Sequence, residues 1–347
     1  MNRTRSVFIR ADGSKAIGMG HLSRAHLIAE MLRSRFATDV KIIMRRDPLA
    51  EMFARKKGFD LVLFDAPSVN DEMGFLEAFA QKEKPRLLIL DVLENDTDPS
   101  YMRVCRQFSA PIVAVTDDSS RRTIDADIIV NGNPAQTGLN YDGQKGRYLL
   151  GPKYFLMDDA YAQNKRELAY HKAEKLLISL GASDHHDLLF KLLGSIKGIE
   201  RDMALVLVIS SASGYVERLK DFLTGYPKKY DLYVDAPNLV PFWEQVDLAV
   251  TAGGNTLFER IASRVPGATL CQLQRQMEIA DSFERLGLNY NLGFGPGLGP
   301  DMIQGRLEKF LEDKVGHQVQ FDKSPQFVDG KGLRRLADVL EPLLKGV

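Results

Sequence analysis

Short runs of apolar residues alternate with longer amphipathic segments along the first 130 residues of the chain. The run Ser6–Arg10 is strand-like, and the segment from His21 to about Arg35 carries a broad apolar stripe at helical spacing. Further strand-like runs in this half are Val40–Met44, Leu61–Phe64, Arg86–Leu90, Ile112–Val115 and Ile128–Val130. Because strands that alternate with helices form parallel sheets, the pattern predicts a parallel α/β domain.

The alternation lapses after Asn131-Gly132-Asn133-Pro134, passes a polar stretch that we expect to be helical (Asp158–Lys175), and begins again at Leu176–Leu180. The later strand-like runs are Ala204–Ile209, Tyr230–Val234, Leu248–Thr251 and Ala268–Leu273. We therefore predict two parallel α/β domains, at 1–155 and 172–330, and an amphipathic C-terminal helix within 331–347. Two such domains can face each other across a cleft at the carboxyl ends of their strands, where ligands of open α/β sheets bind.

Composition narrows the range of partners. Lys+Arg and Asp+Glu are balanced at 46 each, which argues against broad electrostatic binding to nucleic acid or to an anionic membrane. Two cysteines imply no disulfide framework, and no apolar run approaches the length of a membrane span. The N-terminus leads straight into a strand. We expect a cytoplasmic protein without stable membrane insertion, nucleic-acid partner or bound cofactor.

The first candidate site lies between the first strand and the first helix. In the stretch Arg10–Arg24, Gly18 and Gly20 precede His21, and glycine lets the backbone approach a ligand closely. The spacing does not match the dinucleotide fingerprint, because Ser23 stands at the third glycine position. His21, at a helix start beside a strand end, is suited to act as a general base; a packing or capping role is the alternative.

Two further turns follow strands in the second half. Gly253-Gly254-Asn255-Thr256 opens a helix after the strand that ends at Thr251, and a helix start favours a diphosphate. Glu259 lies one turn further on, where a carboxylate can accept hydrogen bonds from ribose hydroxyls. Ser179–Asp184, with Gly181 and Ser183, has the same strand, turn and helix character. The neighbouring His185-His186 pair points in two directions on a helix, so we predict no metal site there.

The stretch Arg10–Arg24 resembles the R-x-D-x-S-x-x-I-G-x-G-H-x-x-R opening of the UDP-sugar hydrolases of pseudaminic acid biosynthesis and of the related spore-coat polysaccharide glycosyltransferase-like proteins. The resemblance continues through further segments in the same order, namely Asp117-Asp118, Asp127–Asn133, Leu150–Tyr154, Ser179–Asp184, Asn238–Glu259 and Gln276–Gly293. These families have the GT-B architecture of two Rossmann-like domains. The second domain also resembles that of the lipid II-forming glucosaminyltransferase.

The resemblance implies a role for each matching residue. His21 corresponds to the proposed general base and Asp12 to an acidic residue that orients the sugar or the base. Gly18, Gly20 and Arg24 of the same loop, with Gln276, lie on the sugar side. The nucleotide is assigned to a larger set, namely Gly181, Ser183, Leu239, Gly253, Gly254, Asn255, Thr256 and Glu259. No metal is implied.

The sugar side departs from the hydrolase pattern. Asp91-Val92-Leu93 stands where the hydrolases carry Asp-His-Tyr, and Arg275 stands where asparagine is usual. The resemblance implies a metal-independent, inverting enzyme that cleaves a UDP-sugar at the anomeric carbon. It favours water as the nucleophile, so that a free sugar and UDP are released. Transfer to a glycan acceptor and non-catalytic binding of the UDP-sugar are the alternatives.

Overall fold

The computed structural model describes residues 6–14, 17–92, 98–120, 123–163, 174–181, 184 and 186–345, without the side chain of Ala212. The chain divides into two compact units. Unit 1 contains Met1–Asp158 and Lys331–Val347, and unit 2 contains Asp159–Gly330. Of the polar stretch Asp158–Lys175, Asp159–Gln163 is a short 3-10 helix (η4), and residues 164–173 lie outside the described part.

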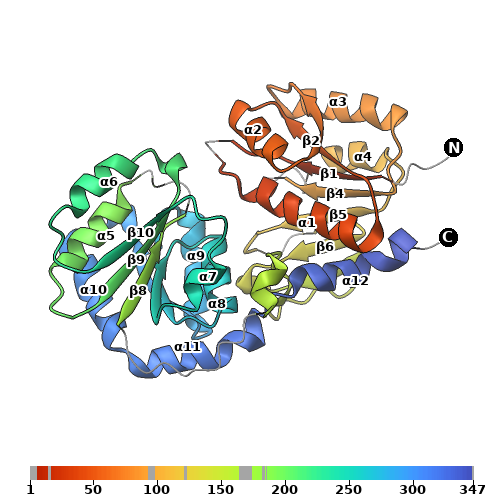
Figure 1. Cartoon of the computed structure of the whole chain (residues 1–347). Helices are drawn as coiled ribbons and strands as arrows, with labels where there is room; N and C mark the ends of the chain where they lie inside the picture. The colour runs from red at the N-terminus through yellow and green to blue at the C-terminus, as the bar shows by residue number, and fades with distance from the viewer. Residues whose placement is uncertain are drawn as a thin grey trace. The chain divides into compact units, whose positions relative to one another are not determined.

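The described part of unit 1 contains a seven-stranded parallel sheet in the order β3-β2-β1-β4-β5-β6-β7 (Figure 1). Its strands are β1 (Val7–Ala11), β2 (Val40–Arg45), β3 (Asp60–Phe64), β4 (Leu87–Asp91), β5 (Ile112–Thr116), β6 (Ile128–Asn131) and β7 (Arg147–Leu150). Strands β1 and β4 are buried along their whole length. Both faces of the sheet are therefore covered, as is usual for parallel sheets.

Helices cover the two faces of this sheet. They are α1 (Gly20–Phe36), α2 (Pro48–Lys56), α3 (Val69–Lys82), α4 (Pro99–Arg106) and α12 (Gly332–Lys345). Val7 and Ile9 of β1 point to the face packed by α1, α2 and α12, whereas Phe8 points to the face packed by α3 and α4. Helices α1 and α12 lie side by side on the first face (Figure 1).

One charged residue interrupts the buried strand β1. The guanidinium of Arg10 donates to Glu72 Oε1 at 2.8 Å and to both carboxylate oxygens of Asp12 at 2.6 Å. Glu72 also accepts from the hydroxyl of Tyr101 and from Arg45. Burial acts to raise the pKa of Glu72, but the charge and hydrogen bonds of Arg10 outweigh burial and lower it. The cluster fixes β1 against α3 and α4 just before the loop that leads to His21.

We expect Glu72→Gln to lower the free energy of unfolding by about 3 kcal/mol, since it breaks a buried ion pair and leaves the guanidinium of Arg10 with Asp12 in place of two carboxylates. The pKa of Glu72 is lowered in the folded state, so its ionised carboxylate stabilises the fold above the ordinary pKa of 4.5. This stabilisation is lost as the pH falls and the carboxylate is protonated. Urea unfolding at pH 7 and pH 4 measures both effects. Asp338→Asn, at the exposed partner of Arg35, is the control with little effect. An unchanged midpoint for Glu72→Gln would contradict this prediction.

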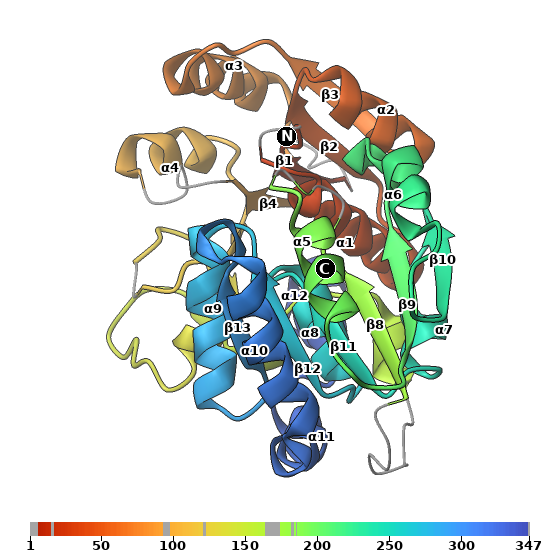
Figure 2. The same ribbon diagram turned by 90° about the vertical axis from the view of Figure 1, so that its left-hand side faces the viewer.

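The described part of unit 2 contains a six-stranded parallel sheet in the order β10-β9-β8-β11-β12-β13 (Figure 2). Its strands are β8 (Lys175–Ser179), β9 (Ala204–Ile209), β10 (Tyr230–Val234), β11 (Leu248–Thr251), β12 (Gly267–Cys271) and β13 (Tyr290–Phe294). The parallel α/β class predicted from the sequence is confirmed in both units. Strands β7 and β13, which form one edge of each sheet, were not predicted.

Seven α-helices are described in unit 2, namely α5 (Leu188–Lys197), α6 (Val216–Leu223), α7 (Val240–Trp243), α8 (Asn255–Ala262), α9 (Gln274–Arg285), α10 (Pro300–Glu312) and α11 (Lys314–Phe327). Helices α5, α6 and α10 pack on one face of the sheet, and α8 packs against α11. The turns that precede α5 and α8 lie at the carboxyl ends of β8 and β11, which are neighbouring strands.

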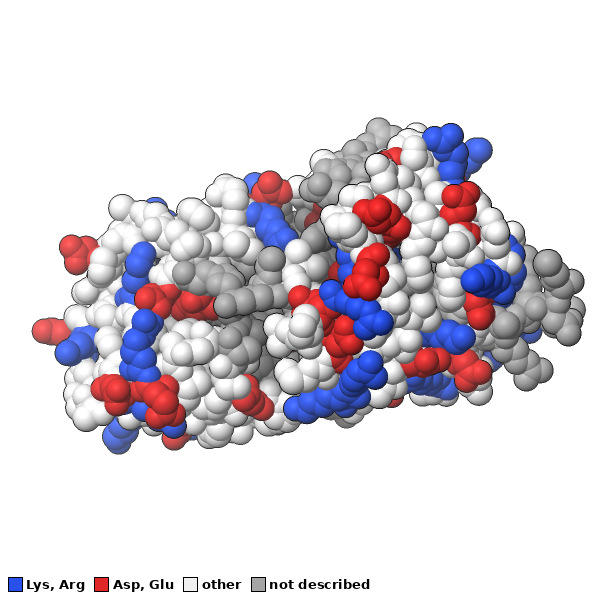
Figure 3. Space-filling view, turned by 90° about the horizontal axis from the view of Figure 1, so that it is seen from above, with Lys and Arg blue, Asp and Glu red and all other residues white. Residues whose placement is uncertain are grey.

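Charged side chains of both signs are present on the face of the molecule that is seen from above. Lys and Arg side chains are interspersed with Asp and Glu over the face shown in Figure 3. Among the described residues, no helix combines the length and the apolar character that a membrane span requires.

Candidate active site

Polar side chains gather at the carboxyl edge of the unit 1 sheet. Strands β1, β4 and β5 are neighbours, and each ends at an aspartate: Asp12 follows β1, Asp91 closes β4, and Asp117 comes directly after β5. Helix α1 begins at the same edge and carries His21 and Arg24 in its first two turns. The carboxyl edge of a parallel sheet is where ligands bind in open α/β folds.

His21 is hydrogen-bonded to Asp91. Its Nδ1 lies 2.7 Å from Asp91 Oδ1. The Asp91 side chain is fully buried, whereas the histidine side chain is 14% exposed. The pair therefore has a buried anion behind an imidazole that reaches the surface of unit 1.

Arg24 holds Asp91 from the other side. Its Nε donates to Asp91 Oδ2 at 2.7 Å and its Nη2 to Asp91 Oδ1 at 2.6 Å. Burial acts to raise the pKa of Asp91, but the charge of Arg24 and the hydrogen bonds from Arg24 and His21 outweigh burial and lower it to about 2. Asp91 is therefore ionised at neutral pH and can only accept hydrogen bonds.

The ionised carboxylate decides the tautomer of His21. Since Asp91 can only accept, Nδ1 of a neutral His21 must carry the proton of their shared hydrogen bond. The lone pair of the imidazole is then at Nε2. A histidine held in this way can take a proton from a hydroxyl group, with the resulting positive charge stabilised by Asp91.

The other predicted residues of this loop have different roles. Asp12 is bound by Arg10 through both oxygens, and it accepts from the backbone N–H of Arg45 at 2.9 Å. The hydrogen-bond partner that orients His21 is thus Asp91, which corrects the part of our prediction that gave Asp12 this role. A contact between Asp12 and a sugar stays a prediction. Gly18 has a φ of +82° and Gly20 begins α1, and there is open space beside both.

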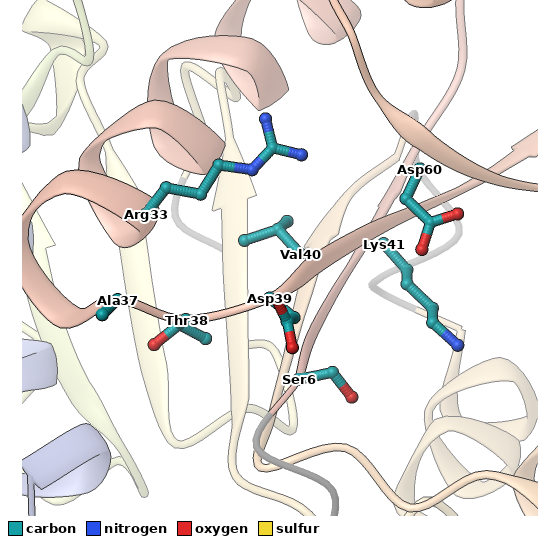
Figure 4. Close-up of a pocket in the computed structure, with 8 residues that line it drawn as sticks. All are labelled: Ser6, Arg33, Ala37, Thr38, Asp39, Val40, Lys41 and Asp60. Atoms are coloured by element: carbon teal, nitrogen blue, oxygen red, sulfur yellow. The ribbon is translucent and has the colours of Figure 1, made fainter.

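A hollow of about 530 Å³ lies at the opposite edge of the unit 1 sheet (Figure 4). It is bounded by the start of β2 and β3 and the end of α1. Its lining residues are Ser6, Arg33, Ala37, Thr38, Asp39, Val40, Lys41 and Asp60. Because ligands bind at the carboxyl ends of parallel strands, the edge that carries His21 is the better candidate for the active site than this hollow.

In unit 2, the turn between β11 and α8 contains the predicted diphosphate residues. Gly254 is the N-cap of α8, and no side chain caps the helix. The N–H group of Leu257 donates to the carbonyl of Gly254 at 3.0 Å, whereas those of Asn255 and Thr256 precede the first intrahelical hydrogen bond and can receive an anion. Gly253 is tightly packed: a Cβ atom at this position would lie 2.8 Å from Gln276 Cβ.

Gln276 is thus brought beside the glycine turn. Its Oε1 accepts from the backbone N–H of Gln272 at 2.8 Å, and the Gln272 side chain donates to the carbonyl of Leu180, which precedes Gly181. The ends of β8, β11 and β12 are therefore connected at one edge of the sheet. Gly181 has a φ of +89° and open space beside it. Ser183, also predicted to bind nucleotide, lies outside the described residues.

Glu259 belongs to a second group on α8. The hydroxyl of Tyr161, a buried residue of η4, is hydrogen-bonded to Glu259, and it interacts with the indole of Trp243 and with the backbone of Leu239. The two residues predicted to hold the nucleoside, Leu239 and Glu259, are therefore linked through one tyrosine. No sequence pattern singled out Tyr161.

Asp91 was also absent from the predicted site. The sequence does show an acidic residue at the end of a fully apolar run, Leu87–Leu90. The pattern does not show, however, that this strand lies beside β1 and so brings Asp91 close to His21. Among the described residues, no three His, Cys, Asp or Glu side chains are grouped so as to hold a metal ion.

Comparison with known proteins supports the same architecture. No protein-family model matches the chain. A spore coat polysaccharide biosynthesis protein, SpsG of Bacillus subtilis, is 24% identical over 342 residues, which cover 97% of this chain and 98% of that protein. The crystal structure of MurG from Acinetobacter baumannii matches with a TM-score of 0.72 at 12% identity, over 97% of this chain and 99% of that one.

A second solved structure, the glycosyltransferase VinC in complex with dTDP, matches with a TM-score of 0.65 at 14% identity, over 98% of this chain and 99% of that one. The chain has the GT-B fold. Its Rossmann-like units, with seven and six parallel strands in their described parts, are the two domains of that fold. At these identities the likeness to solved structures concerns the fold; the chemistry has to be argued from the residues.

Proposed function

We propose that this protein is a glycosyltransferase of polysaccharide biosynthesis that transfers a sugar from a nucleoside diphosphate sugar, with UDP as the nucleotide, to a hydroxyl group of an acceptor. The observation that carries the proposal is the His21–Asp91 pair, a base oriented by a buried and ionised carboxylate at the carboxyl edge of unit 1. The uncapped start of α8 after Gly253-Gly254 supports the nucleotide half of the proposal.

The proposed reaction is a direct displacement with inversion at the anomeric carbon. The acceptor oxygen attacks that carbon while the bond between the carbon and the diphosphate oxygen breaks, and His21 Nε2 takes the acceptor proton. The leaving UDP gains negative charge, which the N–H groups at the start of α8 stabilise. No step requires a metal ion.

Hydrolysis, the reaction that the sequence resemblance favoured, now ranks second. Two of the proteins compared above are named for polysaccharide biosynthesis and for glycosyl transfer, and neither name supports a hydrolase. The His21–Asp91 pair would activate water in the same way as an alcohol. The two reactions therefore differ in the nucleophile and not in the bond that breaks.

The test measures UDP release from UDP-glucose, UDP-galactose and UDP-N-acetylglucosamine, each with and without a panel of methyl glycosides and bacterial polysaccharide fragments. A transferase releases UDP faster when the acceptor is present and places labelled sugar on it. Free sugar formed in equal amount to UDP without acceptor would identify a hydrolase instead. Tight binding of intact donor without turnover would identify a binding protein and end the proposal.

Glu259→Gln should weaken UDP binding about tenfold, since a hydrogen bond to a charged group contributes about 1.5–3 kcal/mol. Calorimetric titration with UDP and with 2′,3′-dideoxy-UDP measures the effect, because a ribose contact predicts a loss for UDP and none for the dideoxy analogue. Glu217→Gln, at an exposed glutamate of the same unit, is the matched control. Equal losses for both ligands would show that Glu259 does not contact the ribose hydroxyls.

A further inference from the structure

Asp117 is the exposed acid of the unit 1 site. Its Oδ1 accepts from Arg24 Nη1 at 2.7 Å, and its side chain is 49% exposed. The same arginine holds Asp91 and lies beside His21. Asp117 is therefore placed next to the proposed base by a buried guanidinium, with half of its surface open to a ligand.

The backbone around Asp117 is held by three side-chain amides that are at least nine-tenths buried. Asn133 donates to the carbonyl of Asp117 at 2.8 Å, and Asn131 donates to the carbonyl of Asp118 at 2.9 Å. Gln136 donates to the carbonyls of Asp118 and Ser120, both at 2.8 Å. The backbone directly after β5 is thereby hydrogen-bonded to residues at and beyond the end of β6.

The two neighbouring acids in this loop differ in what they bind. Asp118 turns back on its own loop, where its Oδ1 accepts from the backbone N–H and the hydroxyl of Ser120. Asp117 makes no such turn contact in the described structure, and it projects toward Arg24. Asp118 thus stabilises the turn of the loop, whereas the carboxylate of Asp117 lies beside Arg24 and is accessible to a ligand.

Stability alone does not account for this arrangement. Asp91 and Asp117 both pair with Arg24, but Asp117 is half exposed, so solvent screens its contribution to folding. With His21 neutral, the group of Arg24, Asp91 and Asp117 has a net charge of −1, and Asp117 is its exposed part. A fixed carboxylate beside a base is well suited to accept hydrogen bonds from sugar hydroxyls and to hold the reacting group in place.

Building on the function proposed above, we propose that Asp117 is a substrate-positioning residue whose carboxylate binds a hydroxyl of the sugar substrate next to the group that His21 deprotonates. That hydroxyl belongs to the donor sugar or to the acceptor sugar. The chemistry of recognition is the same in both cases, and kinetics with each substrate varied in turn distinguishes them.

The experiment compares Asp117→Ala and Asp117→Asn with the wild type, using the donor and acceptor that give the fastest turnover in the panel above. We expect Asp117→Ala to raise the KM of one sugar substrate at least tenfold, with kcat within about threefold and the pH profile of kcat unchanged. Asp117→Asn, which keeps an oxygen acceptor, should recover much of the loss. Asp118→Asn is the matched control, because its amide oxygen can still accept from Ser120.

Different results would overturn the proposal. A lower kcat with unchanged KM values would mean that Asp117 acts only through Arg24 on His21. Equal losses of substrate affinity in the alanine and asparagine variants would indicate that Asp117 binds a cationic group and not a hydroxyl, because both variants lack the negative charge. If the wild type turns over no donor, the proposed function fails by itself. In that case Asp117→Ala must weaken binding of UDP-N-acetylglucosamine or of one of the polysaccharide fragments tenfold and leave UDP binding unchanged, and any other result ends the Asp117 proposal too.

Discussion

His21→Ala is expected to lower kcat by about 10²- to 10⁴-fold, the usual contribution of a general base. Nδ1 of His21 is bonded to Asp91, so the lone pair that can take a proton is at Nε2. Loss of the imidazole therefore leaves the acceptor hydroxyl without a base. UDP affinity should hardly change, because the residues proposed to bind the nucleotide belong to unit 2. Steady-state rates with saturating donor and acceptor, together with calorimetric titration of UDP, measure both quantities.

The control for this variant is His186→Ala, at an exposed histidine of unit 2, which should retain wild-type kcat. Circular dichroism checks that the His21 variant keeps its secondary structure. A His21→Ala enzyme with more than about a tenth of the wild-type kcat would rule out a general-base role of the expected size, while leaving the fold and the nucleotide assignment intact.

Asp91→Asn is expected to lower kcat by about 10³- to 10⁴-fold, although the exchanged atoms do not touch the substrate. An asparagine amide can donate to Nδ1 of His21, and the proton of the imidazole then moves to Nε2, where the base needs its lone pair. The side chain also loses the charge that Arg24 and a protonated His21 require. Rates measured from pH 5 to pH 9 should show the loss throughout this range.

A structural effect would give a different pattern. If the variant merely loosened α1, the apparent KM values and the unfolding midpoint would change together with kcat, and Asp91→Glu would be as defective as Asp91→Asn. If the carboxylate acts on the tautomer, Asp91→Glu should recover part of the activity. A fully active Asp91→Asn enzyme would refute the role assigned to this pair.

The sequence predicted the strands and helices best where apolar periodicity was strong. Strand β1 and helix α1 begin and end within one residue of the predicted runs. Strands β7 and β13 were missed because their local signals are weak. Strand β7 has four residues, and β13 contains Gly293 with a φ of +108° beside an irregularity in its register with β12.

The site was predictable only in part, for a related reason. The glycine turns and His21 could be found because each follows a strand and begins a helix, which is a local pattern. Asp91 and Asp117 depend on the order of the strands in the sheet, which brings Asp91 to His21, 70 positions away, and Asp117 to Arg24, 93 positions away. Such contacts between distant segments leave no periodic signal in one sequence.

The discontinuity of unit 1 has a consequence for how the protein forms during synthesis. Helix α12 supplies Leu333, Leu336, Leu340 and Leu344 to the same core as β1 and α1, yet all of unit 2 precedes it in the chain. While the ribosome makes unit 2, a nascent unit 1 exposes the apolar surface that α12 will later cover. Unit 2, which is one continuous segment, can complete its fold first, and unit 1, which carries His21, would be the last to complete its core.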